Sequence, residues 1–265
     1  MRLETKYVIF LLTIFSCSEP ELQLDNEYDP GNPDFEAPET TIQYVDQVIS
    51  ENEIEIFWDG NQVDMEFQTR LDDGDWSDWS NRKSETFSYL DEGIHEIFVK
   101  GRYASGTVED YPDTVSFEVD AISNNSLRIH PLQTTVVESE VFFVDIMAEE
   151  INALAGAGIA LNFYSNDLTL VDVKKGNFFS DDSDNIILFI NENESAGITN
   201  LQIDIATIDD SQFADGTGVM VVLEFEALSA GTTTIEFDGN YTTLRNANNG
   251  EININELVNG FVKIF

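Results

Sequence analysis

The side chains that most often carry out catalysis are scarce in this sequence. It contains one cysteine, Cys17, and two histidines, His95 and His130, which lie far apart in strand-like segments. A Ser/His/Asp triad, a Cys/His pair and a histidine-rich zinc site each need more of these residues than the chain offers. Carboxylates are abundant, with 51 Asp and Glu residues, so acidic pairs arise by chance. We therefore expect a protein that is not an enzyme.

One acidic loop has the chemistry of a cation site. The segment Ser180–Asp184 reads SDDSD, which places the carboxylates of Asp181, Asp182 and Asp184 close together. Hard cations such as calcium prefer oxygen ligands of this kind. The same segment would also suit an exposed turn. Calcium is the one cofactor that the sequence suggests.

Aromatic residues could bind a sugar by stacking, because flat rings present an apolar face at low entropy cost. The alternative is packing against a hydrophobic core. For Trp76 and Trp79, an arginine such as Arg70 or Arg82 would then lie on a ring. The candidates for glycan stacking are Trp76, Trp79, Tyr164 and Tyr241.

The first residues have the pattern of an export signal. Arg2 and Lys6 precede the apolar run Tyr7–Phe15, which is much shorter than the ~20 residues that span a bilayer. We predict a signal peptide over residues 1–16. The sequence Ile14-Phe15-Ser16-Cys17 resembles a bacterial lipobox, which implies that Cys17 becomes the acylated N-terminus. The alternative is an ordinary signal peptide followed by an incidental cysteine.

The segment behind the cysteine is acidic and rich in proline. Ser18-Glu19-Pro20-Glu21 resembles the export tag of surface-displayed lipoproteins in some Gram-negative bacteria. The resemblance implies an outer-membrane protein that faces the cell exterior and touches the membrane through its lipid anchor only. Residues 17–40 are rich in Asp, Glu, Asn and Pro, which favours an extended, disordered tether.

The charge of the chain limits its partners. The formal net charge is -39 at pH 7. A strongly anionic surface repels phosphate groups, so nucleic acid and direct docking on anionic lipid are excluded as partners. The acids are spread along the chain, which is typical of a solvated surface; cation binding and solubility in salt are the functional alternatives.

Residues 41–121 alternate between polar and apolar side chains, as the strands of a small β-sandwich do. Asp59-Gly60, Asp73-Gly74 and Glu92-Gly93 mark turns. The segment resembles bacterial Ig-like or fibronectin-III-like domains, which implies a spacer role. The predicted strands are Ile42–Val48, Glu53–Trp58, Asp64–Leu71, Glu85–Leu90, Ile94–Tyr103 and Thr114–Val119.

Residues 124–265 carry further strand patterns and predict a jelly-roll β-sandwich, so the whole chain is expected to be all-β. At its centre, Leu154–Gly176 reads as two strands, Ile159–Tyr164 and Leu168–Val173, joined by the polar corner Ser165-Asn166-Asp167. The other predicted strands are Leu127–His130, Thr134–Val137, Val141–Met147, Asn185–Ile190, Asn200–Ala206, Val219–Ala227, Thr233–Phe237 and Leu257–Ile264.

The order of strands and glycines in this second half is similar to that of a cohesin domain. The pattern includes Leu154-Ala155-Gly156, Gly176, Gly216-Thr217-Gly218, Ser229-Ala230-Gly231 and Gly260-Phe261-Val262. Cohesins bind dockerins in polysaccharide-degrading assemblies, and related modules of the same superfamily bind carbohydrate. The resemblance implies a cell-surface lipoprotein whose head binds a dockerin-like protein during extracellular polysaccharide handling. The alternatives are an extracellular glycan as ligand, or a structural role without a dedicated ligand.

The lipobox reading predicts the behaviour of a Cys17→Ala variant. Without the sulfur that carries the acyl chains, we expect the protein to leave the membrane fraction, because burial of methylenes at ~0.8 kcal/mol each would no longer hold it there. Cell fractionation with intact-mass spectrometry measures this. A variant that stays in the membrane fraction with the mass of the unmodified chain would contradict the assignment.

Overall fold

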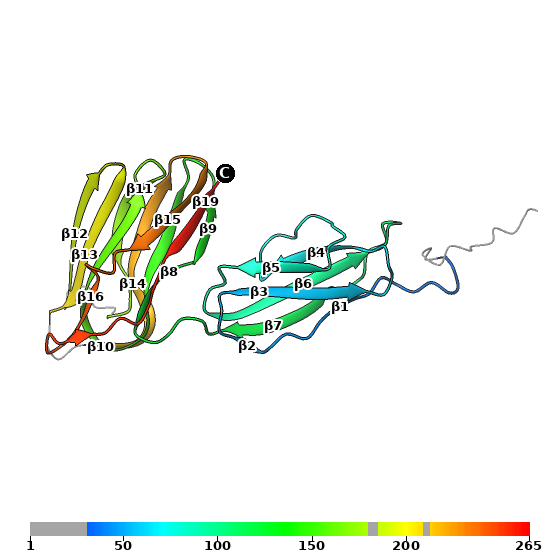
Figure 1. The fold of residues 1–265 in the computed structure, drawn as a ribbon, viewed down its shortest axis with the longest axis horizontal. Helices are drawn as coiled ribbons and strands as arrows, with labels where there is room; N and C mark the ends of the chain where they lie inside the picture. Colours follow the sequence, from blue (N-terminus) through cyan, green and yellow to red (C-terminus); the bar gives the residue numbers. More distant parts are fainter. Residues whose placement is uncertain (1–30, 180–184, 209–212) are drawn as a thin grey trace, which may run out of the picture.

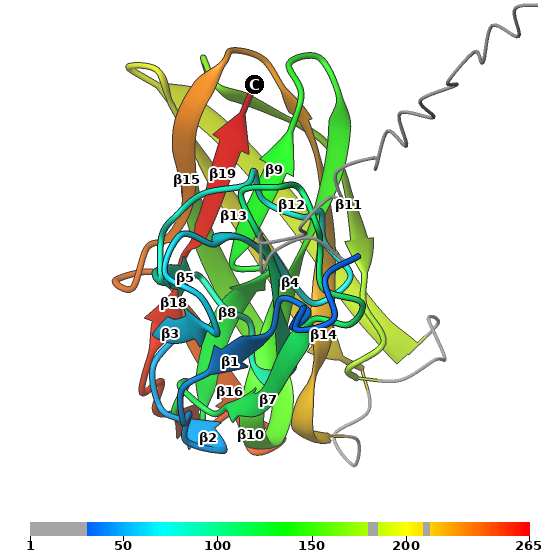
Figure 2. The ribbon, with the colours of Figure 1, turned by 90° about the vertical axis from the view of Figure 1, so that its right-hand side faces the viewer.

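The computed structural model describes residues 31–179, 185–208 and 213–265, and its regular elements are the strands β1 to β19. The predicted all-β class, with a β-sandwich followed by a jelly-roll sandwich, is confirmed. Two separate hydrophobic cores lie along the chain, one in each sandwich. The sandwiches lie end to end (Figure 1), so that the first stands in front of the second in a view along the long axis (Figure 2). In the described part of the chain, no helix is long and apolar enough to cross a bilayer.

The N-terminal sandwich packs a three-stranded sheet, β1-β3-β5, against a four-stranded sheet, β2-β7-β6-β4. Alternation along β3 buries Ile56 and Trp58 and exposes Phe57, and the buried pair meets Phe67 of the opposite sheet. The ring centroids of Trp58 and Phe67 lie 6.1 Å apart in an edge-to-face arrangement. The strands are β1 Thr40–Ile42, β2 Val48–Ile49, β3 Glu53–Gly60, β4 Glu66–Leu71, β5 Ser84–Ser88, β6 Gly93–Arg102 and β7 Asp113–Val119.

The predicted single strand Ile42–Val48 is wrong. The chain changes sheets within it, so that β1 pairs with β3 in one sheet and β2 pairs in parallel with β7 in the other. Here the chain leaves the first ladder after Ile42 and joins the second at Val48. The periodicity of the sequence does not show this break.

The C-terminal sandwich is organised around β10, Val141–Tyr164, which has 24 residues and takes part in both layers. Its first half pairs with β14 and β8, and its second half pairs with β13, β15 and β16. The strands are β8 Ser126–His130, β9 Gln133–Val136, β11 Leu168–Lys175, β12 Ile186–Ser195, β13 Ile198–Thr207, β14 Ala214–Ala227, β15 Gly231–Phe237, β16 Thr243–Asn246, β17 Glu251–Ile252, β18 Leu257–Val258 and β19 Gly260–Ile264.

The predicted break between Val141–Met147 and Ile159–Tyr164 is replaced by bulges within one strand. The register of β10 with β14 shifts after Ile146, after Ala148 and after Ile151. Glu150 and Ala153 have positive φ angles of 46° and 55°. Each bulge adds residues to one strand of a pair and bends it, so the chain turns from one layer into the other without leaving the ladder.

The polar corner that ends β10 is confirmed. Residues 165–167 form a turn, in which the Asp167 amide donates to the Tyr164 carbonyl oxygen at 3.1 Å. The strand behind the corner, β11, pairs with β14 rather than with β10. The corner therefore carries the chain between layers. The predicted strand Leu257–Ile264 is likewise divided, because β18 pairs with β8 whereas β19 pairs with β15 and β9.

A polar joint connects the two sandwiches. The Asp91 carboxylate, in the loop before β6, accepts hydrogen bonds from His130 Nδ1 and from the Leu132 amide, both at 2.9 Å. Its Oδ1 also lies 3.8 Å from a terminal nitrogen of Arg128, whose buried Nε donates to Glu149 at 2.9 Å. These contacts bring Arg128 and His130 of the C-terminal sandwich against one carboxylate of the N-terminal sandwich.

An aromatic contact and a backbone clamp complete the joint. The rings of Tyr89 and Phe261 stack with centroids 4.9 Å apart. Glu92 Oε1 accepts hydrogen bonds from the amides of Ala121 and Ile122 at 2.9 and 3.0 Å, which fixes the segment that leaves β7. Burial raises the pKa of the Glu92 carboxyl despite these two hydrogen bonds.

Substitution of Asp91 tests the joint. In Asp91→Ala, the Leu132 amide and His130 lose their acceptor, and groups left unsatisfied cost about 1–3 kcal/mol each where they are buried. We expect a wider range of angles between the sandwiches, measured by small-angle scattering and residual dipolar couplings, and a lower unfolding free energy. Asp73→Ala, which changes an exposed acid of the same sandwich, is the control. Equal behaviour of the two variants would show that Asp91 does not hold the joint.

His95 makes the stability of the N-terminal sandwich depend on pH. Burial of the ring favours its neutral form, but Nε2 lies 2.8 Å from the Asp91 carbonyl oxygen and Nδ1 lies 2.8 Å from the Asp72 carboxylate. Only an imidazolium donates from both nitrogens, so the net effect is a raised pKa of His95. Its contribution to stability is fully present below the unfolded pKa of about 6.5 and is lost as the pH rises through the folded pKa.

We therefore expect His95→Gln to lower the unfolding free energy more at pH 5.5 than at pH 8.5. Urea unfolding at several pH values measures the difference between the two proteins. A difference that does not change with pH would show that the ring is not charged in the folded state.

Candidate functional site

The outer face of the sheet β12-β13-β10-β16 is the candidate site. The inner side chains of these strands, such as Ile159, Ile203 and Leu244, are buried in the core. Because side chains alternate along a strand, the residues between them face outward. The register aligns them in rows across the sheet, of which one is Ile187, Ala206, Gly156 and Arg245, and the next is Phe189, Asp204, Gly158 and Thr243.

β10 contributes a glycine, and therefore no side chain, to each of these two rows. Gly156 and Gly158 of β10 lie beside Ala206 and Asp204 of β13, so the backbone itself forms much of the floor. Glycine within a strand weakens it and often marks a place where another backbone approaches closely. A Cβ atom on Gly156 would lie 3.0 Å from the Ala206 Cβ, which shows how closely the two strands are packed here.

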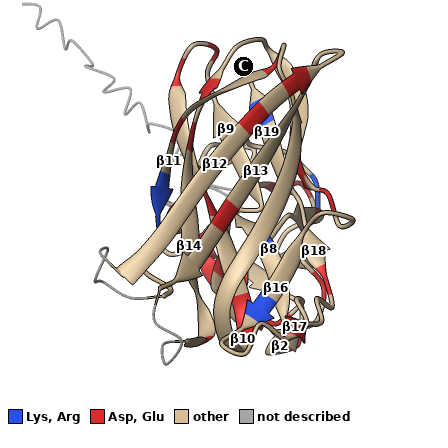
Figure 3. Ribbon diagram, turned by 90° about the vertical axis from the view of Figure 1, so that its left-hand side faces the viewer, with Lys and Arg blue, Asp and Glu red and all other residues tan. Residues whose placement is uncertain are grey.

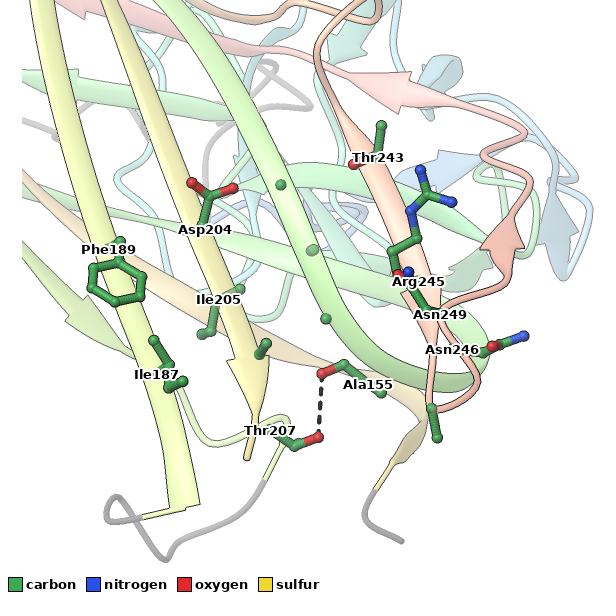
Figure 4. A pocket seen from close by; sticks show the side chains of 15 residues that line it. Ala155, Ile187, Phe189, Asp204, Ile205, Thr207, Thr243, Arg245, Asn246 and Asn249 are labelled. Atoms are coloured by element: carbon green, nitrogen blue, oxygen red, sulfur yellow. Dashed lines mark hydrogen bonds between the residues drawn. The ribbon is translucent and has the colours of Figure 1, made fainter. Parts of the chain in front are cut away.

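The floor and its walls enclose a shallow hollow of about 440 Å³. Figure 4 shows Ile187 and Phe189 on one side of the β10 ribbon and Thr243 and Arg245 on the other. One wall is therefore apolar, with Phe189 66% exposed and Ile187 38% exposed, and the other is polar. The Thr207 hydroxyl donates to the Ala155 carbonyl oxygen at 3.3 Å and holds β13 to β10 at the lower end.

Polar atoms surround the space above Gly158. A Cβ at this position would lie 3.2 Å from Asp204 Oδ1, 3.3 Å from Thr243 Oγ1 and 3.6 Å from Gln202 Nε2. A ligand seated here would meet an acid, a hydroxyl and an amide within one small area. The hollow can therefore combine hydrogen bonds at its centre with apolar contact at Phe189.

The face continues toward the far ends of the strands. The Asn200 amide donates to Asn162 Oδ1 at 2.7 Å, and the Thr234 hydroxyl donates to Glu236 at 2.8 Å. Together with Tyr164, whose side chain is 53% exposed, these residues line a smaller hollow of about 190 Å³. An aromatic ring beside amides and a carboxylate suits a polar ligand with a flat apolar side.

The site is less acidic than the chain as a whole. At the outward positions described above, the acidic side chains are Asp204 and Glu236, and Arg245 is basic. Figure 3 shows β12 and β13 mostly in the colour of uncharged residues, with a few acidic segments. A partner that covers this face therefore has few carboxylates to desolvate, which lowers the cost of binding.

Trp76 and Trp79 lie away from this face, in the N-terminal sandwich, and both are half-buried. The Arg70 guanidinium lies 5.1 Å from the Trp76 ring centroid, and that of Arg102 lies 4.3 Å from the Trp79 centroid. Arg82, the other arginine considered for this role, instead donates to Ser80 at 3.3 Å. Each indole thus has a cation over its ring, which leaves less of it open to a sugar.

Of the other candidates, Tyr164 belongs to the smaller hollow described above. Tyr241 is exposed in the turn between β15 and β16, where its amide donates to the Asp238 carbonyl oxygen at 3.1 Å. The structure does not gather the four aromatics into one platform. Cys17 and the calcium candidates Asp181, Asp182 and Asp184 lie outside the described residues.

Two acids, Glu109 and Asp145, have raised pKa values because they are buried or partly buried. Burial raises the pKa of the Glu109 carboxyl, which accepts hydrogen bonds from the Thr40 amide, the Thr40 hydroxyl and the Gly101 amide. Burial also raises the pKa of the Asp145 carboxyl, although the nearby His130 and Arg128 act to lower it. Within residues 31–179, 185–208 and 213–265, no group of three or more His, Cys, Asp or Glu residues is arranged to hold a metal ion.

Sequence reasoning missed Gly158, Phe189 and Arg245 as site residues. The repeat Gly156-Ala157-Gly158 inside a strand was the available signal, since glycine disfavours a regular strand interior. Phe189 lies in the run Ile186–Ile190, which reads as buried because four of its five residues are aliphatic. The structure places it on the outward row of β12, opposite Asp204 of β13, where it is exposed.

No protein-family model matches the chain, and no curated protein matches it. Many solved structures overlap the chain over about half its length. One is a non-cellulosomal cohesin from Archaeoglobus fulgidus, with 12% identity and a TM-score of 0.42 over 54% of this chain and 92% of the other. Two others are a type II cohesin domain from the cellulosome of Acetivibrio cellulolyticus (17%, 0.46, 53% and 95%) and a type I cohesin-dockerin complex from Clostridium thermocellum (14%, 0.45, 54% and 100%). The TM-scores of these three structures are below 0.5, so they carry no functional argument.

Proposed function

We propose that this chain is a non-catalytic binding protein whose C-terminal sandwich binds a protein partner through the outer face of β12-β13-β10-β16. The observation that carries the proposal is the glycine and alanine floor between an exposed apolar wall and a polar wall. Such a floor lets a partner element approach the sheet backbone closely, and the walls supply contacts on both sides.

The energetics of this face suit protein association. Burial of Phe189, which is 66% exposed, would contribute up to ~1.5–3 kcal/mol, and burial of Ile187, which is 38% exposed, would contribute less. Asp204, Gln202 and Thr243 would set the orientation through hydrogen bonds at the centre. An apolar anchor beside a few convergent polar groups is the usual arrangement of a binding hot spot.

The finer identity of the partner follows from the sequence resemblance described above. A dockerin-like domain is the partner class that a cohesin-like head implies, and extracellular polysaccharide handling is the setting. An extracellular glycan is the second candidate ligand. The smaller hollow of Tyr164, Asn162, Asn200 and Glu236 favours it, because a ring with adjacent amides and a carboxylate can stack on a sugar and bond its hydroxyls.

The proposed location is the outer face of the outer membrane, with Cys17 as a lipid anchor and residues 17–40 as a tether. The N-terminal sandwich would then act as a spacer. The chain enters this sandwich at the end opposite the C-terminal sandwich (Figure 1), which is the arrangement a spacer needs. The joint at Asp91 would hold the binding face at a defined angle to the spacer.

Filling the floor tests the binding face. In Gly158→Arg the new side chain would occupy the hollow beside Asp204, which can pair with it, so the sandwich should still fold. We expect capture of partner proteins from the secreted fraction of the source cells to fall at least about tenfold, a loss of roughly 1.4 kcal/mol. Pull-down with identification by mass spectrometry measures this, and the recovered proteins should share a small appended domain.

Val171→Arg is the matched control, because it adds the same side chain at an exposed position of β11 on the other layer. Equal loss with both variants would argue against the proposed face. If the folded wild-type chain recovers no protein but binds a glycan array, and Tyr164→Ala abolishes that signal, the glycan becomes the ligand.

A further inference from the structure

The edge of β12 that faces away from β13 is a second candidate surface. β12 has ten residues and pairs with β13 over its whole length, without a shift in register. Among the described residues, no strand pairs with its other side, and Figure 1 shows it as the outermost strand of the sandwich. A long, regular edge strand presents unpaired backbone groups that can bind another chain.

The register identifies which backbone groups face this edge. The Ile208 amide donates to the Asn185 carbonyl oxygen at 2.8 Å, which makes these two residues a hydrogen-bonded pair that continues the β12-β13 ladder. Hydrogen-bonded pairs alternate along an antiparallel ladder, so the odd-numbered residues of β12 bond to β13. The amides and carbonyls that point to the open edge are those of Leu188, Ile190, Glu192 and Glu194.

The side chains divide this edge into an apolar half and an acidic half. Phe189 and Ile190 are exposed, the latter by 46%, and the strand then continues as Asn191-Glu192-Asn193-Glu194, all four of which are exposed. The strand has no lysine, proline or bulge of the kind that usually protects an edge. At its start, the ammonium group of Lys175 already donates to the Ile186 carbonyl oxygen.

We propose that the edge of β12 binds an extended segment of a partner protein that carries lysine or arginine opposite Glu192 and Glu194 and apolar side chains opposite Leu188 and Ile190. Charge selects this partner. A second copy of the chain would carry the same net charge of -39 and be repelled, whereas a basic strand is attracted and neutralises Glu192 and Glu194. The proposal does not depend on the function of the adjacent sheet face.

The antiparallel orientation sets the order of residues in such a segment. Because β12 runs from its apolar half to its acidic half, the partner strand would have its basic residues first and its apolar residues last. Its main chain would supply the hydrogen bonds, and its side chains would supply the selectivity, as in other strand additions.

Synthetic peptides test the proposal. The probe is acetyl-Lys-Thr-Lys-Thr-Val-Thr-Val-Thr-amide, and its matched partner has glutamate in place of both lysines. We expect saturable binding of the lysine peptide to the full chain by fluorescence anisotropy, with at least about tenfold weaker binding of the glutamate peptide. Hydrogen exchange should slow at the amides of Leu188, Ile190, Glu192 and Glu194, a pattern that a loose electrostatic contact would not produce.

A charge reversal makes the test specific. The double variant Glu192→Lys, Glu194→Lys should exchange the two preferences and bind the glutamate peptide more tightly. The control Glu138→Lys, Glu140→Lys makes the same change in net charge at exposed sites in the turn between β9 and β10, and should leave the preference unchanged. Failure of the lysine peptide to bind, protection at other amides, or equal effects of the two double variants would overturn the proposal.

Gly158→Arg separates this edge from the sheet face. The substitution fills the hollow between β10 and β13 but leaves the backbone of β12 unchanged. It should reduce capture of the partner proposed for the face and leave peptide binding at the edge intact. Loss of both activities in a folded variant would show that the edge does not act as a separate site.

Discussion

The C-terminal sandwich depends on one continuous strand that changes layers. β10 pairs with β8 and β14 in its first half and with β13, β15 and β16 in its second, and its inward residues contribute to one core throughout. A strand can do this only if its pleat is interrupted where the layers meet. The bulges between Ile146 and Leu154 supply the interruption, and they keep buried side chains such as Ile151 on the inner side of the bend.

The same bend gives the candidate site its shape. Beyond the bend, Gly156 and Gly158 lie at the centre of the second layer. Larger outward side chains at these positions would fill the hollow. The cost of the two glycines to strand stability is offset by neighbours on both sides, β13 and β16, which fix the backbone in place. The outcome is a smooth floor at the middle of the sheet and an aromatic side chain, Phe189, at its margin.

Charged groups are distributed unevenly over the C-terminal sandwich. Arg128 and Glu149 are a buried pair, and removal of either partner would leave an unpaired charge in the core. Asp91 of the N-terminal sandwich lies near the same arginine, so Arg128 contacts both Glu149 and the joint between the sandwiches. On the sheet face, acids are few, whereas on the edge of β12 they are concentrated at Glu192 and Glu194.

The sequence by itself determined the all-β class, most strand positions and the polar corner at residues 165–167, because side-chain alternation and turn chemistry are local properties. It did not determine which strands pair. The single strand expected over Ile42–Val48 and the break expected within β10 were both wrong, since alternation is the same whether a chain stays in one sheet or crosses to another. Only the tertiary structure placed Gly158 beside Asp204 and Thr243, residues 46 and 85 positions away along the chain, and left β12 at an edge. Pairing between such distant segments depends on how the whole core closes, and no local pattern records it.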